Sequence, residues 1–427
     1  MRYLSVLISL VILSVLFSNT GFAQSKPDKV YASEIHSVLI HPFGKPLALP
    51  VINLNAANVL LISFDDFKAE YQDYYYSVEL VDSAWNPIDM NEFDYIKGFN
   101  QNKITDFSAS SIAVQKYFHY QFSFPNSYCS PKLSGNYILK VYRGGNKRDL
   151  IFTRRFFVTE DIVSVAASVH EPFDGELSRS HQKIKISVDV KAIPSFQPDQ
   201  LKVKVIQNFR YNSPQTVSAP SFLRNTVLEF NNESELIFPG GNEARWLDIQ
   251  SLKLKSDRIA EIDAKSALAT IIVKPDVSRS NMMYASFNDL NGGYLIMNTE
   301  SLQSENQNDY ARVLFTYLPK DQIPFLDQRL YLTGALTNND LNTESEMLFD
   351  TKLGVYQKTL LLKQGYYSYN YILRDRNNPN EMDDYMDTEG NHWETENNYG
   401  VFIYYHAPGT RYDQIVGFSS INSKQNW

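Results

Sequence analysis

The sequence predicts a mostly-β protein built from tandem antiparallel β-sandwich domains. The chain of 427 residues contains 28 Tyr and 26 Phe, and aromatic side chains favour strands because they fit a pleated, half-buried surface. Segments in which apolar and polar residues alternate recur along the chain, separated by turn-forming Gly, Pro and Asn residues. The length suggests about two to three domains.

Residues 60–100 show the pattern clearly. The second half of this stretch begins with an alternating segment in which every other residue is large and apolar: Tyr74, Tyr76, Val78 and Leu80. Successive side chains of a strand point to opposite faces. We therefore expect a half-buried strand here, preceded by another extended segment from residue 60.

The segment that follows, residues 85–99, is expected to be a long loop because Pro87 and Gly98 interrupt it. It carries four large aromatic residues among Asp and Asn: Trp85, Phe93, Tyr95 and Phe99. Two interpretations stay open. These side chains pack inward and cap their own domain, or they anchor a partner, as Tyr and Trp do at many interfaces. The four are our candidate partner-binding residues.

The first predicted domain spans residues 24–160. Residues 38–58 contain three prolines, which forbid helix and are typical of an edge strand. Alternation at 116–124 and 137–141, and a Gly145 turn into 150–158, complete an antiparallel sandwich of immunoglobulin-like size.

The second predicted domain spans residues 161–280. Ile184, Ile186, Val188 and Val190 alternate with Lys183, Lys185, Ser187, Asp189 and Lys191. We expect the first set in the core and the second in water. Residues 201–205 and 252–255 repeat the pattern, so both are predicted as strands. Gly240 and Gly241 are expected to form a tight turn between strands.

The third predicted domain spans residues 281–427. Its expected strands are residues 310–318, 330–336, 356–362, 366–373 and 399–406. Short linkers with no low-complexity spacer join the three domains.

The N-terminus predicts export. A positive Arg2, an apolar run at residues 4–17 and a small-x-small site before Gln24 define a cleavable secretory signal peptide, residues 1–23. The apolar run is too short for a membrane anchor. The single cysteine, Cys129, allows no internal disulfide and is far from the processing site. We expect a soluble, exported mature chain.

The formal charge of −8 argues against nucleic-acid partners and against anionic membrane surfaces. Residues 381–394 hold Asp383, Asp384, Asp387 and Glu389, but their spacing does not fit an EF-hand, so a solvated acidic loop is expected. The histidines lack zinc-type spacing, and His119 is expected to be a satisfied sandwich residue. No metal or cofactor is expected.

Catalytic motifs are also missing from the sequence. No G-x-S-x-G turn occurs, and Cys129 has no histidine near it in sequence, so we interpret it as a small apolar residue in a turn. Paired carboxylates of a glycosidase stay open, because their separation is spatial. The sequence therefore predicts a non-enzymatic protein.

The motifs and their order resemble the plug protein family of the type IX secretion system of Bacteroidota. The resemblance rests on residues 63–66 (SFDD), 73–76 (DYYY), Trp85, 95–100 (YIKGFN), 133–137 (LSGNY), 154–156 (RRF), 238–243 (FPGGNE) and 395–399 (TENNY). It implies a periplasmic protein that docks on the periplasmic opening of a large outer-membrane translocon β-barrel of the SprA type and closes it when no substrate is passing. It implies no reaction centre and no membrane insertion.

The third domain separately resembles early-set immunoglobulin-like domains, which include glycogen-binding modules, through residues 331–334 (YLTG) and the strand at 366–371. In such modules exposed Trp residues stack on sugars, and Trp393 is the residue to consider. The alternative function is therefore a periplasmic carbohydrate-binding module.

Overall fold

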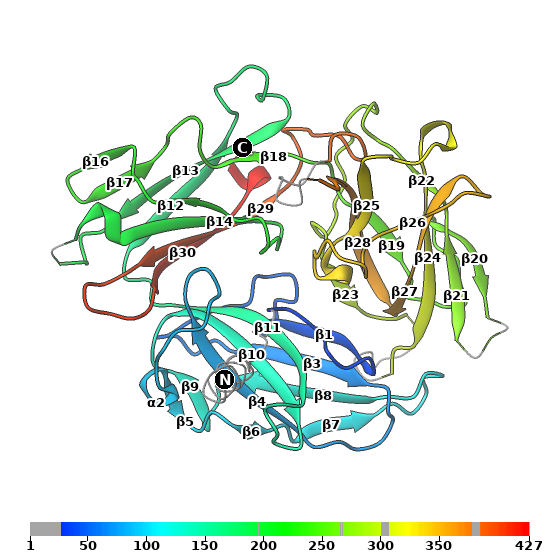
Figure 1. Ribbon diagram of the computed structural model, residues 1–427, viewed down its shortest axis with the longest axis horizontal. Coiled ribbons are helices and arrows are strands. Elements are labelled where there is room, and N and C mark those ends of the chain that lie inside the picture. Colours follow the sequence, from blue (N-terminus) through cyan, green and yellow to red (C-terminus); the bar gives the residue numbers. More distant parts are fainter. Residues whose placement is uncertain are drawn as a thin grey trace, which may run out of the picture.

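A computed structural model describes residues 27–194, 196–264, 266, 268–299, 307–377 and 385–426. The predicted signal peptide, residues 1–23, lies outside this part. The chain forms three lobes arranged around a common centre (Figure 1). We call them the N-terminal lobe (residues 27–160), the middle lobe (residues 161–239 and 397–426) and the third lobe (residues 243–377). Two crossings join the last two lobes: residues 240–242, and a connector, residues 385–396.

Two sheets face each other in the N-terminal lobe. In hydrogen-bonded order, one contains β1 (Ile35–Pro42), β3 (Leu60–Asp66), β8 (Phe118–Phe124) and β7 (Asp106–Ala109). The other contains β2 (Val51–Asn53), β11 (Leu150–Thr159), β10 (Gly135–Arg143), β4 (Tyr74–Val81) and β6 (Asn102–Lys103). A short helix, α2 (Glu92–Tyr95), precedes β5 (Ile96–Gly98), which forms a small two-stranded antiparallel sheet with β9 (Cys129–Pro131). As the prolines predict, β1 lies at a sheet edge.

The middle lobe also has two sheets. One contains β12 (Ser164–His170), β13 (His181–Asp189), β17 (Val227–Phe230) and β16 (Phe222–Arg224), with β18 (Ile237–Pro239) paired to β13. The other contains β15 (Gln215–Val217), β14 (Leu201–Gln207), β29 (Asn398–Tyr405) and β30 (Gln414–Asn422). The 3-10 helices η1 (Pro198–Gln200) and η4 (Ser423–Asn426) flank strands of this lobe.

In the third lobe, β28 (Gly365–Asp375) pairs with β19 (Arg245–Asp248), β23 (Tyr294–Ile296) and β25 (Gln328–Thr333). The facing sheet runs β20 (Ile259–Asp263), β21 (Ala269–Val273), β24 (Tyr310–Leu318), β27 (Val355–Lys363) and β26 (Leu348–Asp350), with β22 (Asp276–Val277) beside β24. The 3-10 helices η2 (Lys320–Gln322) and η3 (Ala335–Thr337) lie in loops.

The predicted mostly-β class is confirmed. Most strand pairs are antiparallel, and α2 has only four residues. Tyr74, Tyr76, Val78 and Leu80 are all buried, as their alternation predicts. The expected strands at 310–318, 356–362, 366–373 and 399–406 correspond to β24, β27, β28 and β29.

The sheets do not follow a simple row of segments divided at residues 160 and 280. β29 hydrogen-bonds to β14 of the middle lobe, and β30 pairs with β29, although both strands follow the third lobe in sequence. β19, β20 and β21, which precede residue 280, belong to the third lobe. Alternation within one strand identifies the strand, but its pairing partner is non-local and is not encoded in that pattern.

Two local predictions were wrong. Lys183 was expected in water, yet it is fully buried, and its Nζ donates to the main-chain oxygens of Asn232 and Glu235. Residues 252–255 were expected to form a strand, yet they form bends with Leu254 exposed. Four residues of alternation without a neighbouring strand do not suffice for pairing.

Hydrophobic clusters bury the contacts between lobes. Phe157 and Trp85 of the N-terminal lobe pack with Ile206, Phe402 and other apolar residues of the middle lobe. Tyr117 and Phe67 of the N-terminal lobe pack with Tyr310 of the third lobe. The lobes are therefore packed against one another rather than tethered by linkers.

Candidate functional site

Of the four candidate aromatics in the predicted loop at residues 85–99, some side chains pack into the interior and others face solvent. Trp85 adopts a positive φ of 68° and is half-buried. Its ring meets Phe157 edge-on at 5.3 Å, and the Arg155 guanidinium lies 5.2 Å from its centroid. Beside it, the Ser83 amide donates to Asp413 of the middle lobe at 2.9 Å. Trp85 thus belongs to the junction between two lobes.

Tyr95 is in the core. It ends α2, whose N-terminus is capped by Asn91, and its ring packs against Tyr137 at 6.2 Å. Only 5% of the residue is exposed. Tyr95 therefore packs inward, as the first of the two interpretations expects.

Phe93 and Phe99 are the two members of the set that face solvent, with 66% and 75% exposed. A third aromatic, Tyr128, is 69% exposed and directly precedes β9, the strand that pairs with β5. The Phe99 amide donates to the Tyr128 oxygen at 2.9 Å, because β5 pairs with β9. We call Phe93, Phe99 and Tyr128 the aromatic edge.

Gly98 makes this edge possible. A Cβ at Gly98 would lie 2.1 Å from the Tyr128 carbonyl oxygen, and φ there is +91°. Glycine is the residue that tolerates both a positive φ and a close backbone approach. The glycine of the YIKGFN motif therefore has a direct structural role in holding Phe99 against Tyr128.

A cation links the three lobes at their centre. Arg155 of β11 donates from Nε to Asp28 at 2.5 Å and from Nη2 to Asn212 of the middle lobe at 3.0 Å. Asn212 in turn donates to Asp340 of the third lobe at 2.7 Å. The Arg155 guanidinium also lies 4.9 Å from the centroid of the Tyr211 ring.

A buried ion pair joins the N-terminal and third lobes. The Lys363 Nζ lies 2.6 Å from the Asp65 Oδ2, and both side chains are almost fully buried. Asp65 also accepts from Tyr310 at 2.5 Å and from the His119 ring at 2.6 Å. Burial alone would raise the pKa of Asp65, but Lys363 and His119 more than offset this and hold it below its ordinary value. His119 is thus a satisfied sandwich residue, as predicted.

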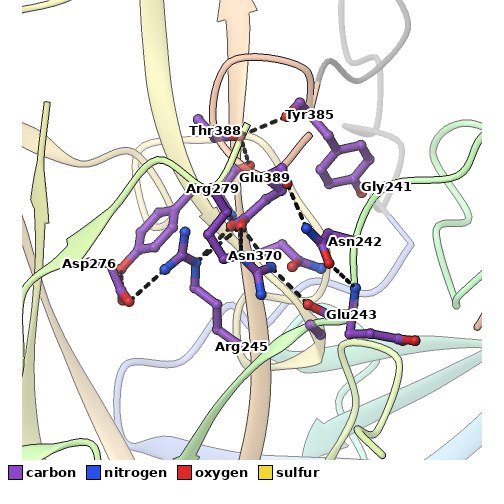
Figure 2. A network of polar contacts seen from close by, with 12 residues as sticks. Gly241, Asn242, Glu243, Arg245, Asp276, Arg279, Asn370, Tyr385, Thr388 and Glu389 are labelled. Carbon is purple, nitrogen blue, oxygen red and sulfur yellow. Dashed lines mark hydrogen bonds and ion pairs between the residues drawn. The ribbon is translucent and has the colours of Figure 1, made fainter. Parts of the chain in front are cut away.

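A third polar network holds the connector against the third lobe (Figure 2). Glu389 is fully buried and accepts from Arg245 at 3.0 Å and from Arg279 at 2.8 Å. Arg245 also donates to Asp276 at 2.7 Å. Although burial opposes its charge, the two arginines keep the pKa of Glu389 below its ordinary value. The expectation of a solvated acidic loop was wrong for Glu389, and Asp383 and Asp384 lie outside the described residues.

Two motifs distant in sequence meet at the same place. The FPGGNE and TENNY motifs contact each other through Asn397 Nδ2, which donates to the Gly240 oxygen at 2.9 Å, and Thr395 Oγ1, which donates to the Gly241 oxygen at 2.9 Å. Gly240 is required because a Cβ there would lie 2.1 Å from the His392 oxygen. These motifs fasten the middle lobe to the connector.

The described residues offer no group of three or more His, Cys, Asp or Glu side chains that could hold a metal ion. Cys129 is buried in the N-terminal core, and burial raises the pKa of its thiol to about 12, so it is not a poised nucleophile. Its interpretation as a small apolar residue is correct. In the described part of the chain, the helices are too short or too polar to cross a membrane.

Trp393 is only partly exposed. Its main chain is held to the middle lobe, since its amide donates to the Arg179 oxygen at 3.0 Å and its oxygen accepts from Gln182 at 2.6 Å. Trp393 therefore lies in the connector, with its main chain fixed to the middle lobe.

The fold and these junctions define a three-lobed β-sheet protein with buried ion pairs at its junctions and an exposed aromatic edge. Residues 35–160, nearly the whole N-terminal lobe, match the family model described as the type 9 secretion system plug protein 1st domain. This lobe is thus similar to the first domain of the type 9 secretion system plug proteins, as the resemblance of its motifs indicated.

A solved structure shares the whole architecture. A hypothetical protein from Parabacteroides merdae ATCC 43184 is 28% identical, with a TM-score of 0.88, over 93% of this chain and 99% of that one. An alkylpurine DNA glycosylase from Pseudomonas fluorescens aligns over 29% of this chain with a TM-score of only 0.16, which carries no argument. No curated protein matches the chain.

Proposed function

We propose that this protein is a non-enzymatic periplasmic plug, which binds and closes the periplasmic opening of the outer-membrane type IX translocon when no substrate is being transported. The observation that carries the proposal is the match of residues 35–160 to the plug family. The partner in this proposal is a large β-barrel of the SprA type. The protein reaches the periplasm through a cleavable signal peptide and associates with the barrel peripherally.

The geometry supports this role. A plug must cover an opening without deforming, and each lobe junction here is held by a buried apolar cluster, a buried ion pair or a buried hydrogen-bond network. We propose an immunoglobulin-like or early-set sandwich for each lobe. Such sandwiches are rigid because both sheets share one core.

The aromatic edge is the partner surface that we propose. Phe93, Phe99 and Tyr128 are exposed on the lobe that matches the family. Large exposed aromatic side chains bury much apolar surface when a partner binds them, and so they act as interface anchors. Trp85 and Tyr95, the other two sequence candidates, hold the lobe and its junction together instead.

The experiment is a pull-down of the tagged mature chain from solubilised outer membranes, followed by mass spectrometry. We expect a large translocon barrel to co-purify, and Phe93→Ser with Phe99→Ser to reduce its recovery. Phe173→Ser is the matched control, because Phe173 is 89% exposed on the middle lobe. Recovery of no barrel would contradict the proposal.

A further inference from the structure

A cavity of about 130 Å³ lies where the three lobes meet. Its wall includes residues 38–40 and 46–48 and Arg154 from the N-terminal lobe, Phe209 and Tyr211 from the middle lobe, and Tyr294 and Asn338 from the third lobe. Since one water occupies about 30 Å³ in the liquid, the cavity has room for a group of a few heavy atoms. Most of this wall is apolar.

Arg154 is the unusual member of this wall. The residue is 6% exposed, and it lies between Phe152 and Phe156 on β11. Its guanidinium donates from Nη1 to the Thr153 oxygen at 2.9 Å and from Nη2 to the Val38 oxygen at 3.4 Å. The second acceptor is available at a bulge, because the β1–β3 register shifts between His36 and Leu39.

In the part of the chain that the structure describes, no carboxylate forms an ion pair with Arg154. Asp28, which lies in this wall, pairs instead with Arg155, which donates to it from both the main-chain amide at 2.7 Å and Nε at 2.5 Å. Asp340 accepts from Asn212 instead. Burial lowers the pKa of Arg154 below its ordinary value, and Asp28 and Asp340 offset only part of that effect.

A buried guanidinium is stabilised by an anionic counter-charge, and main-chain carbonyls compensate for its charge only in part. An arginine fork is also the geometry that recognises carboxylate and phosphate groups. We propose that the cavity binds a small oxyanion, a carboxylate or a phosphate group, on the guanidinium of Arg154. A bound oxyanion contacts walls from all three lobes and stabilises their assembly. This inference does not depend on the proposed plug function.

The test is thermal unfolding of the full mature chain in inorganic phosphate, in acetate and in chloride at equal ionic strength. We expect phosphate or acetate to raise Tm by about 1.5 °C per tenfold increase in concentration above the Kd, for a chain of this size. A response to one of the two identifies which oxyanion the site takes. Equal Tm values in all three salts would overturn the proposal.

Variants separate the site from general salt effects. Arg154→Met removes the guanidinium and should abolish the oxyanion response, whereas Arg148→Met, on the exposed turn after β10, should keep it. Ala335→Val leaves Arg154 in place and narrows the cavity, so it should weaken the response even if Arg154→Met fails to fold. An unchanged response in Ala335→Val, or a retained response in folded Arg154→Met, would overturn the proposal.

Discussion

Asp65 and Lys363 are 298 residues apart in sequence, yet their Oδ2 and Nζ atoms lie 2.6 Å apart in the buried junction between the N-terminal and third lobes. Asp65→Asn should leave Lys363 charged and uncompensated. Breaking a buried pair by removing one partner costs about 3–5 kcal/mol. Denaturant unfolding measures this loss of stability as a change in the free energy of unfolding.

The matched control is Glu346→Gln, which removes an exposed pair with Arg329 at 3.3 Å. Exposed pairs are worth about 0–1 kcal/mol. Equal, small losses for the two variants would show that the Asp65 junction does not hold the lobes together.

Acid should weaken the assembly in a defined pH window. The folded-state pKa values of Asp65 and Glu389 lie below their ordinary values of 3.8 and 4.5. A carboxyl with a lowered folded pKa contributes stability above its unfolded pKa and loses it as pH falls through the folded value. We therefore expect Tm to fall steeply below about pH 4.5.

His36 should cause a separate loss of stability at higher pH. Burial lowers the pKa of His36 from 6.5, so its share of stability is lost as pH falls below that value. A Tm profile from pH 8 to 3 separates the two windows. Asp65→Asn should reduce the loss of Tm in the lower window, to which Glu389 still contributes, and should not remove the upper window, because the Asp65 charge opposes the lowering of the His36 pKa. An unchanged lower window in this variant would contradict the assignment.

Gly98→Ala should disturb the aromatic edge. The new Cβ meets the Tyr128 oxygen at 2.1 Å, so β5 and β9 have to separate and Phe99 must move. Gly44→Ala is the matched control, because Gly44 also has a positive φ, +74°, but nothing within 4 Å of the added Cβ. Hydrogen exchange of the Phe99 amide reports the difference. Equal protection of this amide in both variants would refute the role assigned to Gly98.

The sequence predicts structure that depends on residues close together in the chain better than structure that depends on residues far apart. The strands around Tyr76 and Ile186 follow from local alternation, and both residues are buried as expected. The Asp65–Lys363 pair does not, because two charges 298 residues apart have no shared local pattern. From sequence, Lys183 and Glu389 are predicted to be exposed to solvent. They are buried because their partners come from other segments of the chain.

The exposure of the four candidate aromatics could be predicted only in part. Phe93 and Phe99 are exposed as the partner interpretation requires, whereas Trp85 and Tyr95 pack inward. Their surroundings decide this: Trp85 is held by Arg155, which the sequence does not place beside it. Tyr128 was missed because it precedes Cys129 in a turn with no periodic pattern, and only the β5–β9 pairing brings it to Phe99.

The two exposed aromatics should matter for binding and not for folding. Phe93→Ser with Phe99→Ser is expected to change the free energy of unfolding by less than about 0.5 kcal/mol per site, because exposed substitutions away from special features cost little. Tyr95→Ala should cost about 3–5 kcal/mol, since it empties a core position. Denaturant unfolding of the three proteins checks this order. A large loss in the Phe93 and Phe99 variant would show that these side chains support the lobe instead.

The most direct test of the plug proposal is the conductance of the purified translocon barrel in a planar lipid bilayer, measured with and without the mature chain on its periplasmic side. We expect the barrel alone to conduct small ions and the bound chain to close it. The Phe93→Ser, Phe99→Ser variant, added in place of the wild-type chain at the same concentration, should leave the barrel conducting. A barrel whose conductance is the same with and without the wild-type chain would contradict the proposal.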